Sequence, residues 1–117
     1  MASQVFPMQG NPRQIFVPYN GKIADITHAD TNKHTLDLAA ALPETRKIIE
    51  VELATNRIAG TGTFYTYPNE GATRSEIISP YRGDGVVIAN ATQRLQYSLS
   101  AANDDWDLYC LGYVVEA

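Results

Sequence analysis

Apolar and polar residues alternate with a period of two along much of the chain, which is the pattern of half-buried β-strands. Residues 94–100 give the cleanest example, and residues 48–59 repeat it with Glu50 and Glu52 on the polar side. The side chains predicted to face the core are Leu95, Tyr97 and Leu99 in the first segment and Ile49, Val51 and Leu53 in the second.

Shorter apolar segments, separated by turn residues, fill the rest of the chain. Asn20-Gly21 is the strongest hairpin signal. Residues 35–43 combine Leu and Ala with a terminating Pro43, so a short strand followed by a helical turn is predicted there. Short strands with turns every eight to twelve residues or so favour an all-β fold. We therefore predict an antiparallel two-sheet β-sandwich that is jelly-roll-like.

The first third of the chain differs from the remainder. Pro7, Pro12 and Pro18 each remove a backbone donor, which suits edge strands or an extended segment. The predicted organisation is therefore an N-terminal extended arm and edge strands at residues 1–34, followed by a β-sandwich domain at residues 35–117.

The last strand, residues 106–115, is apolar on both faces. In strict alternation, one row enters the core and the other faces outward, and an exposed apolar row of this kind usually marks an interface. We predict that this outer row holds a homo-oligomer together, although a cover formed by the N-terminal arm or a loop is the alternative. The predicted interface residues are Tyr109, Leu111, Tyr113 and Val115.

Composition narrows the function classes. The chain has 117 residues, a net charge of −4 and nine basic residues, mostly scattered singly, which disfavours nucleic-acid binding. No apolar stretch approaches a membrane span, and no secretory signal is apparent, so synthesis in a cytoplasm is expected. The single cysteine, Cys110, lies in an apolar strand and excludes an intrachain disulfide framework.

Two polar clusters in the sequence carry side chains that could bind a metal ion. His28, Asp30 and His34 could ligate a metal, but their spacing matches no helix face and a solvated loop is the simpler interpretation. Residues 103–107 offer four oxygen-bearing side chains, which suit a calcium loop or a hairpin turn, and the turn is favoured. Because no nucleophile is paired with a base, the sequence predicts no enzyme, no cofactor and no metal.

Aromatic side chains with polar neighbours suit a carbohydrate, because a sugar has an apolar C–H face and hydroxyl groups that need partners. Core or interface packing is the alternative role for the same rings. The candidate glycan-binding residues are Tyr65, Tyr67, Tyr81 and Trp106.

The segments TLDLAAALPETRKIIEVEL, GTFYTYPNEG, VVIANATQRLQYSLS and WDLYCLGYVVEA together resemble small β-sandwich domains of tailed-bacteriophage virions. That resemblance covers residues 35–117 and implies a non-enzymatic structural role, as a capsid decoration protein or a short fibre or receptor-binding head, in a homotrimer. It implies a location in the virion and partners such as the major capsid protein, with a host surface glycan as a further partner. A carbohydrate-binding module is the alternative function.

Overall fold

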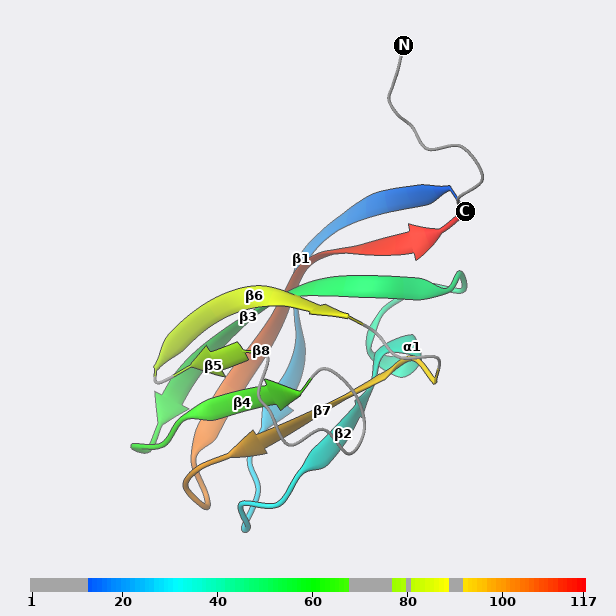
Figure 1. Cartoon of the computed structure of the whole chain (residues 1–117). Helices are drawn as coiled ribbons and strands as arrows, with labels where there is room; N and C mark the ends of the chain where they lie inside the picture. The colour runs from blue at the N-terminus through cyan, green and yellow to red at the C-terminus, as the bar shows by residue number, and fades with distance from the viewer. Residues whose placement is uncertain (1–12, 68–76, 80, 89–91) are drawn as a thin grey trace.

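The computed structural model describes residues 13–67, 77–79, 81–88 and 92–117 (Figure 1). These residues form eight strands and one short helix. The strands are β1 (Gln14–Ile26), β2 (His34–Asp37), β3 (Ile48–Ala59), β4 (Phe64–Tyr67), β5 (Ile77–Ser79), β6 (Arg82–Ile88), β7 (Arg94–Leu99) and β8 (Asp105–Glu116), and the helix is α1 (Leu38–Ala41).

The strands form two four-stranded antiparallel sheets in the orders β1-β8-β3-β6 and β2-β7-β4-β5. Strand β1 pairs with β8, β2 with β7, β3 with β6 and β4 with β5. The chain is thus one long antiparallel hairpin, β1–β4 against β5–β8, rolled so that its pairs alternate between the sheets. Nested pairing of this kind is the jelly-roll arrangement, so the predicted all-β, jelly-roll-like sandwich is confirmed.

The predicted short strand and helical turn are also confirmed, as β2 and α1. The Asp37 carboxylate caps the turn by accepting the Ala39 backbone N–H at 3.0 Å. The turn closes with the Leu42 N–H donating to the Leu38 carbonyl, and Pro43 follows directly. Leu38 and Leu42 are both buried, so the turn closes one end of the core.

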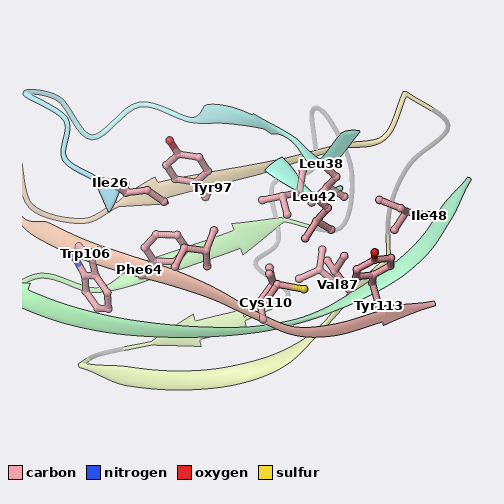
Figure 2. Packing of buried hydrophobic residues seen from close by; sticks show 14 of the residues in the cluster. Ile26, Leu38, Leu42, Ile48, Phe64, Val87, Tyr97, Trp106, Cys110 and Tyr113 are labelled. Atoms are coloured by element: carbon pink, nitrogen blue, oxygen red, sulfur yellow. The ribbon is translucent and has the colours of Figure 1, made fainter. Parts of the chain in front are cut away.

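The core fills the space between the two sheets (Figure 2). At one end, Trp106 and Phe64 lie together with ring centroids 5.4 Å apart. At the other end, Tyr113 lies near Ile48 and the residues of the helical turn. The inward positions predicted in β7 are all buried, as are Val51 and Leu53 of β3. The prediction for Ile49 is wrong, because a register shift between Ile48 and Glu50 places Ile48 in the core instead.

A similar irregularity in β8 overturns part of the predicted outer row. On β3, Leu53 pairs with Cys110 and Glu52 pairs with Gly112, so Leu111 is an extra residue in β8. The bulge reverses the alternation beyond that point. Tyr113 and Val115 consequently point into the core, where they are 3% and 0% exposed. Their predicted place on the outer face was therefore wrong.

The hairpin predicted at Asn20-Gly21 is wrong too, because both residues lie inside β1. Asn20 has a left-handed backbone, with φ at 58°. The register between β1 and β8 shifts between Pro18 and Gly21, so the left-handed residue serves a bulge instead of a turn. Strand β1 bends there and continues to Ile26, which is buried.

Strand β1 forms one edge of the first sheet, and its residues Ile15, Val17 and Tyr19 pack against the core. Figure 1 shows β1 and β8 running side by side to the end of the chain. Residues 14–26 are therefore an integral part of the sandwich, whereas residues 1–12 of the predicted 1–34 arm and edge strands lie outside the described residues.

Candidate functional site

The interior of the sandwich is occupied by packed side chains. Cys110 is buried among them, and burial raises the pKa of its thiol. Across the described ranges, no group of three or more His, Cys, Asp or Glu residues is placed to hold a metal ion. The outer surfaces of the two sheets carry the exposed side chains that could contact a partner.

The strand register arranges the outer face of the first sheet as rows that cross β1, β8, β3 and β6. Two rows are mostly apolar, and they lie toward the end of the sheet that carries Glu116. Two further rows, toward the opposite end, are mostly polar. The apolar rows are Phe16–Val114–Glu50 and Pro18–Gly112–Glu52–Val86, and the polar rows are Lys22–Tyr109–Ala54–Asp84 and Asp25–Asp107–Asn56–Arg82.

In the polar half, neighbouring charges satisfy one another. The Lys22 ammonium lies 2.8 Å from the Asp25 carboxylate and 3.6 Å from that of Asp107. The hydrogen bond to Asp25 raises the pKa of Lys22 and lowers that of Asp25. On the far strand, Arg82 Nε donates to Asn56 Oδ1 at 3.1 Å. The polar half has the character of an ordinary solvated surface.

In the apolar half, a groove of about 150 Å³ crosses the sheet. Phe16 on β1 and Val86 on β6 line it, and their residues are 55% and 47% exposed. Gly112 lets the Phe16 ring lie directly against β8, because a Cβ atom at this position would lie 2.3 Å from the ring. Val114 completes the apolar lining. Large apolar side chains that share one groove in this way are typical of an interaction surface.

Charged residues accompany this groove. Glu50 and Glu52 project from β3 into its lining. Arg13 and Lys47 are exposed and lie at the neighbouring tip of the sheet. Their position is fixed by the end of β8, because the Arg13 carbonyl accepts the Ala117 backbone N–H and the Lys47 carbonyl accepts that of Glu116. The same end of the molecule therefore carries carboxylates within the apolar groove and cations beside it.

The predicted interface residues divide between two locations. Tyr109 and Leu111 are half-buried on the outer face, whereas Tyr113 and Val115 belong to the core. Sequence reasoning missed Phe16 and Val86, the most exposed apolar side chains of the groove. A signal for Phe16 was present, because Ile15, Phe16 and Val17 form an apolar run that must place one residue on the far face.

The candidate sugar-binding aromatics do not gather on one surface. Trp106 is fully buried, which is incompatible with stacking on a sugar. Tyr65 and Tyr67 share one face of β4, as expected, but the Lys33 ammonium already lies 4.3 Å from the Tyr67 ring centre. Tyr81 precedes β6 of the other sheet, where the guanidinium groups of Arg57 and Arg82 lie 5.1 and 5.4 Å from its ring centre.

The polar clusters have structural roles. In the 103–107 segment, Asp104 is buried and its carboxylate accepts the backbone N–H groups of Thr61 at 3.2 Å and Gly62 at 2.7 Å. These bonds tie the β7–β8 turn to the β3–β4 loop. At the start of β2, His34 donates to Asp30 of the preceding loop at 2.8 Å and stacks on His28, with ring centroids 3.4 Å apart.

Replacing Asp104 by Ala should lower the free energy of unfolding by about 1–3 kcal/mol, because two backbone N–H groups lose their acceptor. Urea denaturation measures this loss. We also expect calcium and a chelator to leave the melting temperature of the wild-type protein unchanged, since both carboxylate oxygens of Asp104 are already hydrogen-bonded. A stabilisation by calcium that the Ala variant lacks would contradict this assignment.

Comparison with protein-family models, with curated proteins and with solved structures finds no significant match to this chain. No helix within the described ranges is both long enough and apolar enough to cross a membrane.

Proposed function

We propose that this protein is a non-enzymatic structural building block that assembles with copies of itself, as a homotrimer, through the apolar half of the outer face of its first sheet. The setting we propose is a virus particle, in which the protein serves as a capsid decoration or a short fibre head. The observation that carries the proposal is the groove between Phe16 and Val86, lined by apolar side chains and by two glutamates.

A second copy is the occupant that the charges favour. The groove holds the carboxylates of Glu50 and Glu52, and exposed Arg13 and Lys47 lie at the adjacent tip of the same sheet. When two copies meet at this end, the cations of one can face the carboxylates of the other while the apolar side chains are buried between them. Electrostatic complementarity of this kind determines which partner binds and how the two surfaces are aligned, and it adds less to the affinity.

The fold supports the virion setting by analogy only. Jelly-roll domains are common in viral capsids and in lectins, and the same architecture also hosts enzymes such as cupins. In this chain the space between the sheets is filled by the core, and the described residues hold no metal-binding cluster. This favours a protein that acts through its surface, in agreement with the likeness of residues 35–117 to phage virion domains.

Sedimentation equilibrium at micromolar concentration tests the proposal. We expect the wild type to sediment as a trimer and Phe16→Asp to sediment as a monomer, because the substitution places a charge in the centre of the apolar contact. Phe16 is 55% exposed, so the monomeric variant should keep a melting temperature close to that of the wild type measured under dissociating conditions.

Ile58 supplies a matched control. It is 52% exposed on β3 of the same sheet, but it is not part of the groove. Ile58→Asp should therefore remain a trimer. A monomeric wild type would refute self-assembly, and a trimer that tolerates Phe16→Asp but dissociates with Ile58→Asp would move the interface to the opposite end of the sheet.

A further inference from the structure

The chain contains two histidines, and they stack on each other. The rings of His28 and His34 are nearly parallel, with an interplanar angle of 5° and a centroid separation of 3.4 Å. His28 lies in the loop of residues 27–33, which leaves β1 in the first sheet, and His34 is the first residue of β2 in the second sheet. The two stacked rings therefore lie at the two ends of the connection that runs from the first sheet to the second.

Hydrogen bonds fix both rings. His28 Nε2 and the Tyr97 hydroxyl are 2.8 Å apart, and the His28 carbonyl accepts the Asn103 backbone N–H at 2.7 Å. His34 Nε2 donates to the Asp30 carboxylate at 2.8 Å. The pair thus joins the 27–33 loop to β7 through Tyr97 and to the β7–β8 turn through Asn103.

Tyr97 connects the histidine pair to the hydrophobic core. The Tyr97 ring is stacked on Phe64, with centroids 5.5 Å apart, and Phe64 in turn lies against Trp106. Figure 2 shows Tyr97 and Ile26 beside these two rings. Movement of the histidine pair would therefore change the packing around the single tryptophan of the chain.

The geometry accommodates one proton more readily than two. A proton on His34 faces the Asp30 carboxylate, whereas a proton on His28 faces a neutral hydroxyl and a parallel imidazolium ring. Burial and the neighbouring charge of His34 lower the pKa of His28, and the charge of Asp30 offsets only part of this. Like charges in van der Waals contact repel strongly where solvent is partly excluded.

The other titratable groups around the pair have partners of their own. Lys33 lies over the Tyr67 ring, and Asp105, at the start of β8, accepts the Thr27 hydroxyl at 3.3 Å. Asp104 is bound to the β3–β4 loop, as described above. Burial raises the pKa of Tyr97, so its hydroxyl stays neutral between pH 5 and 7. Among the described residues that act on His28, Asp30 is therefore the source of compensating negative charge.

We propose that His28 and His34 form a pH-sensitive clasp that holds the 27–33 loop against β7 and the β7–β8 turn at neutral pH and releases it when His28 is protonated. Because the pKa of His28 is lower in the folded protein than its ordinary value of 6.5, the clasp stabilises the fold fully above that value. The stabilisation is lost as the pH falls from about 6.5 through the folded pKa. The carboxylates Asp30 and Glu44, whose pKa values are lowered, titrate below this window.

NMR titration of the histidine ring protons tests the clasp directly, since two signals cover every histidine in the chain. In the wild type, His28 should titrate with a midpoint below 6.5. His34→Gln removes the second charge, so the His28 midpoint should move upward. Two histidines that titrate independently, with a His28 midpoint unchanged by His34→Gln, would overturn the proposal.

Release of the loop has a separate readout in the Asn103 amide, which donates to the His28 carbonyl. Its hydrogen-exchange protection factor should fall by about tenfold per unit by which the His28 pKa is depressed, when the pH is lowered from 7 to 5. His28→Gln can keep a hydrogen bond to Tyr97 without titrating. In this variant, the protection factor of the Asn103 amide should therefore not depend on pH. Far-ultraviolet circular dichroism verifies that each variant is folded. Equal loss of protection in the wild type and His28→Gln would refute the clasp.

Discussion

Tyr113→Asp should unfold the protein, with a loss of about 4 kcal/mol or more in the free energy of unfolding. Tyr113 is 3% exposed and belongs to the hydrophobic core, at the end closed by the helical turn. Its hydroxyl donates to Glu44 at 3.1 Å, and the short Asp side chain would leave its charge among apolar neighbours. Urea denaturation, followed by circular dichroism, measures the effect.

Tyr113→Phe is the matched control, because it keeps the ring and removes only the hydroxyl. We expect a loss of about 1 kcal/mol, the usual contribution of one hydrogen bond. If Tyr113→Asp instead gave a stable, folded monomer, Tyr113 would be an interface residue and the bulge at Leu111 would have been assigned incorrectly.

The error at Tyr113 shows where sequence periodicity stops being sufficient. Strict alternation assigns Tyr113 to the same face as Tyr109, and the extra residue Leu111 reverses that assignment. Nothing in the composition of this apolar segment distinguishes a bulged residue from a paired one. The bulge depends on the register between β8 and its neighbours β1 and β3, whose residues paired beside Leu111 are more than 50 positions away in sequence.

A left-handed backbone conformation does not by itself show whether the residue lies in a hairpin turn or in a β-bulge. The hairpin predicted at Asn20-Gly21 was wrong, although Asn20 has the left-handed backbone that a two-residue hairpin turn requires, with φ at 58°. The same backbone geometry serves a tight turn or a bulge, and pairing of both sides of β1 with β8 decides between them. By contrast, β7 has no irregularity in its pairing with β2 or β4, and its inward residues were predicted correctly.

The candidate assembly surface could be predicted only in part. Phe16 lies in a short apolar run, but Val86 and Glu52 become its neighbours only through the strand order β1-β8-β3-β6. The stacking of the histidine pair likewise could not be predicted from the sequence alone. Five residues lie between His28 and His34, and the stacking of the two rings depends on where β2 meets Tyr97 of β7.

Trp106→Ala should cost about 3–5 kcal/mol, because Trp106 is the largest fully buried side chain and its removal leaves a cavity against Phe64. Tyr65→Ala, a second aromatic-to-Ala change at a half-buried site on β4, should cost far less. Urea denaturation of the two variants distinguishes a core role for Trp106 from the sugar-binding role on the surface that the sequence predicted.

Trp106→Phe sharpens the test. The indole N–H of Trp106 is buried and has no hydrogen-bond partner among the described residues, so part of the stabilisation by the ring is offset by an unsatisfied donor. Phe keeps most of the apolar contact with Phe64 and removes that donor, so the variant should lose less than about 1.5 kcal/mol. A loss as large as that of Trp106→Ala would mean that the N–H is bonded in solution, most simply to a buried water.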